Sequence, residues 1–238
     1  MTSPPARPRP QLDPERIIET LALLRARIDE RFPGSGLSAL AADLLAVASD
    51  SVARLRAITR PNLPIRAGVV LLLLAIVALL ARLVASVRIQ VMFSDFGAFL
   101  QALDAAKNVV LFLGAAVFFL VTAESRIRRQ RALRSVRELR AVAHLVDMHQ
   151  LTKDPDRVAE RGTATPSSPA LEMTAYELSR YLDYCSELLS LTSKIAALHA
   201  QTFDDPVVLG AVDEVEALTT GLSGKVWQKI VVLNHTDL

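Results

Sequence analysis

The sequence is short of residues on which several common classes of protein depend. Its 238 residues include one cysteine, Cys185, so no disulfide can form within the chain. Glycine is scarce, with nine residues, and aromatic residues make up only 5% of the chain. The β-sandwich and the nucleotide-binding α/β folds rely on more glycine than this. Disulfide-stapled domains and sheet-based folds are therefore the classes that we expect least.

Motifs that carry catalysis are equally scarce. Residues 221–225, GLSGK, lack the GxxxxGK[ST] spacing of a phosphate-binding loop, and no strand precedes them. Ser223 does not stand in a GxSxG frame, and we find no nucleophile–base pair, zinc finger or nucleotide fingerprint. The sequence leaves enzymatic activity open, and it favours a protein that has none and needs no cofactor.

What the chain does contain is apolar residues, which make up 51% of it and give a mean hydropathy of +0.32. Most of them are leucine, alanine and valine, and leucine and alanine are strong helix formers. We therefore expect an all-α protein, and specifically a two-transmembrane-helix hairpin with a cytosolic helical bundle.

Two apolar runs predict the hairpin. Residues 67–81 carry no charge, and the run extends to residue 87 with Arg82 as its one interruption. Residues 108–123 form a second uncharged run, which reaches a full span if Lys107 extends its side chain to the interface. A span of the hydrocarbon core needs about 20 mostly apolar residues, which both segments approach or reach.

The distribution of basic residues predicts the orientation. Four arginines lie between residues 54 and 66, and seven lie between residues 126 and 140, whereas the segment between the two runs has only Arg88 and Lys107. Positive charge collects on the cytosolic side, so both termini should face the cytosol of a bacterial cell, with the hairpin in its inner membrane. Residues 88–107 fit a short amphipathic helix at the outer interface or an extension of the spans.

Arg82 lies inside the first apolar run. One interpretation is that its long side chain reaches the interface. The other is an intramembrane charge facing the bundle interior and paired with Asp95 or Asp104.

The chain divides by composition into six segments. Residues 13–15 suit a helix start, with Asp13 as the cap and proline in the first turn. The segments are a disordered tail (1–12), an N-terminal cytosolic helical pair (13–64), the hairpin (65–124), a basic juxtamembrane helix (125–151), a linker (152–170) and C-terminal cytosolic helices (171–238).

The most regular pattern covers residues 171–201. Apolar and small residues recur there at alternating spacings of four and three, which is typical of a coiled-coil seam. A wider stripe that also includes Tyr181, Leu188 and Ile195 instead indicates an ordinary bundle helix, which we favour. A last helix should begin near Pro206 and be interrupted at residues 221–224.

The basic segment predicts a lipid contact. Five arginines share one face of the helix that follows the second run, and anionic lipid headgroups are their natural partner rather than nucleic acid. These residues are Arg126, Arg129, Arg134, Arg137 and Arg140. The C-terminal acidic residues, among them Glu187 and Glu214, fit a solvated face, or alternatively a partner for these arginines.

A single cluster could hold a metal ion. His144, Asp147 and His149 lie within six residues and offer two imidazoles and a carboxylate to a divalent cation. On a regular helix His149 lies about 140° from His144, so the three converge only if the helix ends or bulges near Met148. Otherwise the two histidines only stabilise the end of the helix.

These features predict a membrane-anchored, homo-oligomeric helical scaffold or regulatory protein without catalytic activity. The first alternative is a pore-forming or membrane-disrupting effector, in which Arg82 and the small residues 114–116 face neighbouring hairpins. The second alternative is a metal-dependent membrane enzyme or sensor that uses His144, Asp147 and His149.

Overall fold

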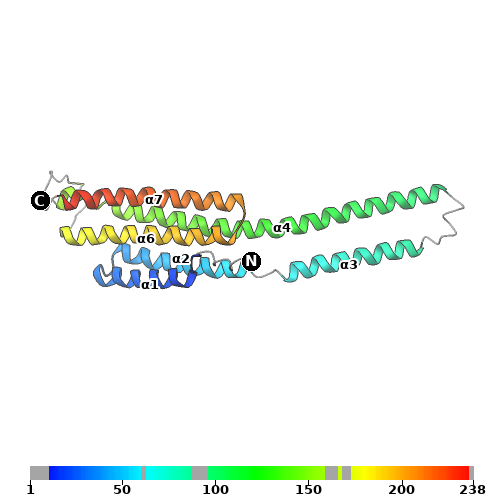
Figure 1. Cartoon of the computed structure of the whole chain (residues 1–238), viewed down its shortest axis with the longest axis horizontal. Coiled ribbons are helices and arrows are strands. Elements are labelled where there is room, and N and C mark those ends of the chain that lie inside the picture. The colour runs from blue at the N-terminus through cyan, green and yellow to red at the C-terminus, as the bar shows by residue number, and fades with distance from the viewer. Residues whose placement is uncertain (1–10, 60–62, 87–95, 159–165, 168–172, 236–238) are drawn as a thin grey trace, which may run out of the picture. The chain divides into compact units, whose positions relative to one another are not determined.

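The part of the chain that the structure describes is entirely helical. The computed structural model describes residues 11–59, 63–86, 96–158, 166–167 and 173–235, with some side chains of residues 58–124, 157 and 158 left out. The helices are α1 (Pro14–Arg31), α2 (Gly36–Thr59), α3 (Leu63–Ser86), α4 (Phe96–Leu151), α5 (Pro155–Val158), α6 (Ala175–Thr202) and α7 (Pro206–Asn234) (Figure 1). Within these ranges no strand forms, and the all-α prediction is confirmed.

Contacts between residues divide the chain into two compact units. The first unit comprises Met1–Ala57 and Arg131–Leu238, and the second comprises Ile58–Gln130. Helix α4 is continuous from Phe96 to Leu151 and therefore contributes residues to both units. The two ends of the chain therefore share one apolar core.

Side-chain caps fix where three of the helices begin. The Asp13 carboxylate accepts hydrogen bonds from the backbone N–H of Glu15 and Arg16, and the Asp205 carboxylate does the same at the start of α7. Thr174 and Glu177 form a reciprocal capping box at the start of α6. Each cap satisfies backbone donors that have no partner within the helix. The cap predicted at Asp13 and the helix start predicted near Pro206 are confirmed.

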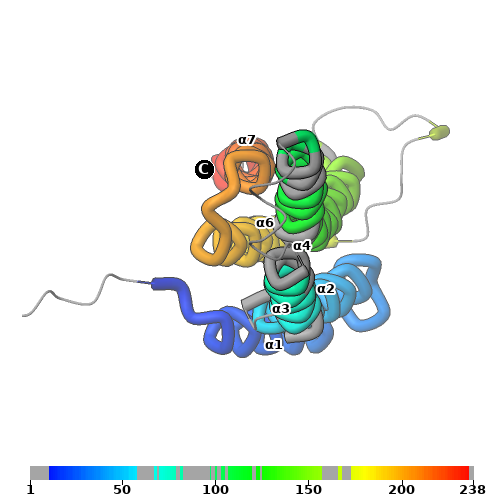
Figure 2. Tube along the Cα trace, turned by 90° about the vertical axis from the view of Figure 1, so that its right-hand side faces the viewer, coloured from blue at the N-terminus to red at the C-terminus, as the bar shows by residue number. Residues whose placement is uncertain are grey.

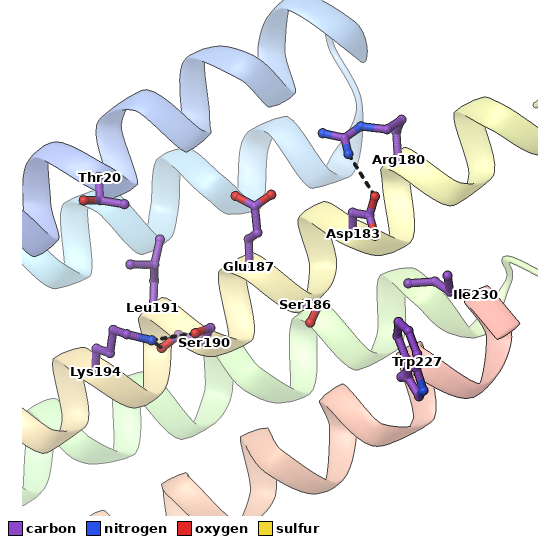
Figure 3. A pocket seen from close by; sticks show the side chains of 10 residues that line it. All are labelled: Thr20, Arg180, Asp183, Ser186, Glu187, Ser190, Leu191, Lys194, Trp227 and Ile230. Atoms are coloured by element: carbon purple, nitrogen blue, oxygen red, sulfur yellow. Dashed lines mark hydrogen bonds and ion pairs between the residues drawn. The ribbon is translucent and has the colours of Figure 1, made fainter.

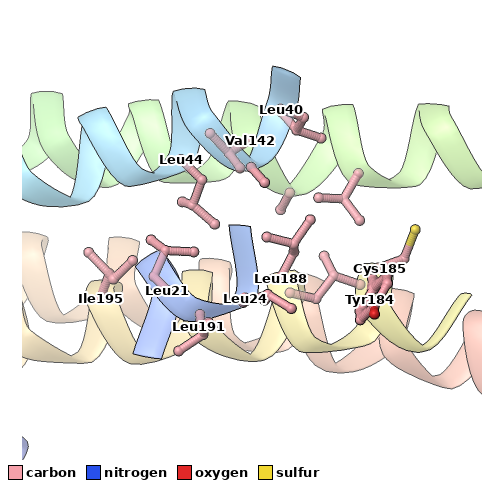
Figure 4. Packing of buried hydrophobic residues seen from close by; sticks show 14 of the residues in the cluster. Leu21, Leu24, Leu40, Leu44, Val142, Tyr184, Cys185, Leu188, Leu191 and Ile195 are labelled. Atoms are coloured by element: carbon pink, nitrogen blue, oxygen red, sulfur yellow. The ribbon is translucent and has the colours of Figure 1, made fainter. Parts of the chain in front are cut away.

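The core of the first unit settles the two interpretations of residues 171–201. On α6, Tyr181, Leu188 and Ile195 are as deeply buried as the residues of the narrower seam, including Leu182 and Cys185. The buried stripe is therefore wider than a coiled-coil seam, and α6 is a bundle helix. Side chains from α1, α2 and α4 complete the same apolar cluster (Figure 4).

Polar contacts tie neighbouring helices of this unit together. Figure 2 shows α6 and α7 of the unit side by side. Arg54 of α2 donates to Glu138 of α4 at 2.7 Å and to Ser135 at 3.0 Å. Lys229 of α7 donates to the carbonyls of Gln150 (2.6 Å) and Lys153 (3.0 Å). The lysine thereby satisfies a carbonyl in the last turn of α4, which has no partner within the helix, and one just beyond its end.

One expectation about an interruption needs correction. Helix α7 runs through Gly221 and Gly224 without a break. Its neighbours Leu222 and Val226 are buried against the bundle, and this packing outweighs the weak helix propensity of two glycines. The linker expected at residues 152–170 contains the short helix α5, and its residues 159–165 and 168–170 lie outside the described ranges.

Helix α4 is longer than the predicted second span. It begins at Phe96, so residues 96–107 extend the helix that carries the second apolar run and do not form a separate one. The rest of the expected interfacial segment, residues 88–95, lies outside the described ranges. The helix predicted at residues 125–151 continues the second apolar run without a break, and the 56 residues of α4 correspond to a length of about 84 Å.

The described residues include one helix that is long and apolar enough to cross a membrane, Gly36–Ala57 in α2. It is 44% buried within the protein, and Leu40 and Leu44 lie in the core of the first unit. Length and composition alone cannot distinguish such a core helix from a span. Lys107–Phe119 is apolar but shorter. The predicted pair of spans is therefore not confirmed by this finding.

The two units differ in where their large apolar side chains point. In the first unit most of them lie in the core, whereas many described ones in the second unit are exposed. On α3 these include Leu71, which is 72% exposed, and on α4 Phe112, which is 75% exposed. The others are Val70, Leu73, Leu74, Val77, Leu100, Leu103, Val110, Leu111, Phe118, Phe119 and Ile127.

Candidate functional site

A groove of about 530 Å³ runs along the face of the first unit formed by α1, α6 and α7 (Figure 3). Trp227 of α7, the only tryptophan of the chain, is 63% exposed and lines it together with Ile230. From α6 come the hydroxyls of Ser186 and Ser190, and the remaining lining residues are Thr20, Arg180, Asp183, Glu187, Leu191 and Lys194. The groove thus joins one large aromatic surface to many hydrogen-bonding groups.

The charged groups of the groove already have partners within the protein. Arg180 and Asp183 pair at 2.9 Å, and Glu187 accepts a hydrogen bond from Arg27 of α1 at 2.9 Å. Lys194 donates to the Ser190 hydroxyl at 2.6 Å. The lysine acts as a donor here and does not abstract a proton, so this pair is not arranged as a base and a nucleophile.

The structure brings together one serine and one histidine that sequence reasoning did not connect. Ser51 Oγ of α2 lies 2.8 Å from His199 Nε2 of α6, and both side chains are fully buried. The Nδ1 atom of His199 has no hydrogen-bond partner among the described residues, so no carboxylate orients the ring as in a catalytic triad. Burial, aided by the nearby Arg54, lowers the pKa of His199 to about 4. The Ser51–His199 pair is therefore a buried contact between neutral side chains, and a substrate cannot reach it.

The residues of the expected metal cluster do not converge. Helix α4 continues past Met148 to Leu151, so the early end that convergence required does not occur. Asp147 accepts a hydrogen bond from Gln150 at 2.7 Å, and the His149 ring lies against Gly36 at the start of α2. His144 is exposed. Among the described residues no group of three or more histidine, cysteine, aspartate or glutamate side chains is placed to hold a metal ion.

Several of the five arginines expected to meet lipid make contacts within the protein. Arg134 pairs with Glu138 at 3.3 Å, and Arg137 donates to the Leu133 carbonyl at 3.3 Å. Arg140 pairs with Glu214 of α7 at 2.8 Å, as the alternative interpretation of the acidic residues anticipated. Arg126 is exposed and Arg129 is half-buried. An exposed ion pair contributes little stability, so these contacts leave the arginines able to bind anions.

Arg82 is exposed on α3. Asp104, one of its two expected partners, forms an ion pair with Lys107 at 2.7 Å. The other, Asp95, lies outside the described residues.

The fold and the groove define a helical-bundle protein whose surface carries an amphipathic groove. Comparison of the chain with models of known protein families, with curated proteins and with solved structures finds no match. Sequence reasoning missed the groove because its residues come from α1 near the N-terminus and from α6 and α7 near the C-terminus. Trp227 was the one available signal, since it lies next to Gln228 and Lys229 in a segment expected to be helical.

Proposed function

We propose that the protein is a membrane-anchored, homo-oligomeric helical scaffold or regulatory protein without catalytic activity. In this proposal the second unit crosses the inner membrane of a bacterial cell as a two-helix hairpin. The first unit lies in the cytosol with both termini. The observation that carries the proposal is the outward-facing apolar surface of the second unit.

Lipid gives that surface the environment it lacks in water. Covering one large apolar side chain is worth about 1.5–3 kcal/mol, and Leu71 and Phe112 are only two of many on α3 and α4. The 24 residues of α3 correspond to about 36 Å, which exceeds the roughly 30 Å of the hydrocarbon core. The first unit needs no such cover for most of its apolar side chains, because they pack on one another.

The arginines that begin three residues after the second apolar run support the same location. Arg126 and Arg129 are the nearest of the five, and anionic headgroups attract basic residues at this position by about 1 kcal/mol each. The proposal therefore assigns anionic lipids as partners of this segment.

Extraction and labelling of intact cells test the anchor. The protein should remain in membranes washed with alkaline carbonate. A cysteine placed at Asp104 should react with an impermeant maleimide from outside the cell, and one placed at Thr220 only after the cells are opened. Both positions are exposed, and the native Cys185 is buried, so the introduced thiol is the accessible one. Release by carbonate, or protection of both thiols from outside, contradicts the anchor.

Native mass spectrometry of the protein in mild detergent tests the oligomer. A single defined subunit number is expected, and cross-linking in native membranes should give the same number. Monomers in both measurements would remove the oligomeric part and leave the anchor standing.

A further inference from the structure

A second hollow adjoins the groove and is lined chiefly by guanidinium groups. Its volume is about 450 Å³, and its lining residues are Arg27, Glu30 and Arg31 of α1 with Arg180 and Tyr184 of α6. Three arginines face one carboxylate there. Because Arg27 and Arg31 are four residues apart, they share one face of α1, and the packing of α1 on α6 brings Arg180 to the same place.

The arginines are held by groups that leave donors free. Arg27 uses one terminal nitrogen for Glu187, and Arg180 uses one for Asp183, and both carboxylates line the neighbouring groove and not this hollow. A guanidinium has five N–H donors in a fixed plane, so each of these ion pairs occupies only part of it. The paired carboxylates orient Arg27 and Arg180 and occupy only part of each donor set, and the Tyr184 side chain is a further hydrogen-bond partner of Arg31 and Arg180.

Aromatic rings fix the positions of the same groups. The Arg180 guanidinium lies 5.1 Å from the centre of the Tyr184 ring, and Arg31 lies 5.5 Å from that of Tyr176. Tyr184 is buried and meets Phe32 edge to face, with ring centres 6.3 Å apart. The floor of the hollow is therefore rigid, which lowers the entropy lost when a ligand binds.

Glu177 lies one turn before Arg180 on α6, and its carboxylate is engaged in the cap of that helix. Glu177 accepts hydrogen bonds from both the backbone N–H and the hydroxyl of Thr174, at 2.9 Å each, in the capping box of α6. These hydrogen bonds keep the pKa of Glu177 below its usual value, so the carboxylate stays charged and bound to the cap.

We propose that Arg27, Arg31 and Arg180 form a binding site for a phosphate group carried by a ligand. Arginine matches phosphate geometry with two parallel N–H···O bonds, and charge-assisted bonds of this kind are the strong ones. The volume suits a ligand larger than free phosphate, since small-molecule sites usually measure about 300–1,000 Å³. The phosphate belongs either to a soluble metabolite or to a lipid headgroup.

Calorimetric titration of the full chain in a neutral detergent tests the site. The probes are inorganic pyrophosphate and a water-soluble short-chain phosphatidylglycerol, and sodium sulfate at matched ionic strength is the control anion that carries no phosphate. Both R31Q and R180Q should weaken binding of the preferred probe by about tenfold or more, since each removes charge-assisted bonds. Tighter pyrophosphate binding assigns a soluble ligand, and tighter lipid binding assigns a headgroup.

R25Q is the matched control, because Arg25 is exposed on α1 and does not line the hollow. It removes the same charge and should leave affinity within twofold. R31K keeps the charge but loses the planar fork, and it should bind more weakly than the native chain. Circular dichroism checks that each variant is folded.

The proposal is wrong if neither probe binds the folded native chain, or if R25Q weakens binding as much as R31Q does. Equal affinity of R31Q and the native chain would also overturn it, and the three arginines would then only join α1 to α6. The membrane anchor does not depend on these residues, so either proposal can fail alone.

Discussion

At the scale of single residues, the buried histidine makes the bundle sensitive to acid. The pKa of His199 is lowered from 6.5 to about 4 by burial, so between these pH values only the unfolded chain takes up this proton. Stability from this residue is complete above pH 6.5 and is lost as the pH falls toward 4. Thermal unfolding between pH 7 and 4.5 should show this loss, with a limiting slope of about 1.4 kcal/mol per pH unit.

His199→Leu should flatten that dependence, because the buried titrating group is gone. His144→Gln serves as the control, since His144 is exposed on α4 and should leave the slope as it is. An unchanged slope in the His199 variant would assign the acid sensitivity to other groups.

Lys229 is the other residue with a sharply defined role. Its ammonium donates to two carbonyls at the end of α4, while partial burial lowers its pKa. Lys229→Met should destabilise the bundle by about 1–3 kcal/mol, because the Lys153 carbonyl loses this donor and the Gln150 carbonyl keeps only the Lys153 N–H. Chemical denaturation measures the loss. Lys225→Met, one turn earlier on α7 and exposed, should change stability by less than about 0.5 kcal/mol.

At the scale of elements, two glycines of α7 are positions where substitution by alanine should stabilise the protein. Gly221 and Gly224 lie on the exposed side of the helix, and nothing lies within 4 Å of a Cβ added at either. Replacing each by alanine should raise the free energy of unfolding by about 0.5–1 kcal/mol, because alanine loses less backbone entropy in a helix.

Gly36→Ala provides the contrast. Gly36 is the first residue of α2, and a Cβ added there would collide with the His149 ring of α4. This variant should gain less than the α7 variants or lose stability, and thermal unfolding of all three in parallel decides it. Equal gains at all three positions would mean that the ring moves aside without cost.

Sequence periodicity predicted the helices well where one face of a helix meets the core. The buried positions Ile17, Leu21, Leu24 and Ile28 of α1 follow from their spacing alone. It failed at Gly221 and Gly224, because local propensity does not include the packing of Leu222 and Val226. The prediction of a break there weighed only the residues next to it in the chain.

The basic hollow could not be predicted, for a different reason. Arg27 and Arg180 are separated by most of the chain, and no pattern in either segment indicates that they meet. The arginine pair at residues 27 and 31 was visible as a shared helix face, but its partner helix was not. Spacing along one helix can be judged from the sequence, whereas contacts between distant helices cannot. The cluster of His144, Asp147 and His149 was predicted for that reason.

At the scale of the whole molecule, a charge placed on the second unit distinguishes lipid from water around it. Leu71 on α3 and Leu23 on α1 are similarly exposed, at 72% and 67%. Under the proposed anchor, Leu71→Asp costs about 2.5–3.5 kcal/mol in the membrane, whereas Leu23→Asp costs little in the cytosol. The fraction of each variant recovered in washed membranes measures the difference. Equal recovery of the two would indicate that Leu71 does not face lipid.

The reactivity of the single cysteine can report local opening of the bundle. Cys185 is fully buried, and burial raises the pKa of its thiol to about 12, so in the folded chain almost none of it is thiolate. Only the thiolate attacks a disulfide reagent at an appreciable rate. The rate at which such a reagent reacts with the thiol therefore reports how often the bundle opens around Cys185. The same measurement can be made in detergent and in lipid.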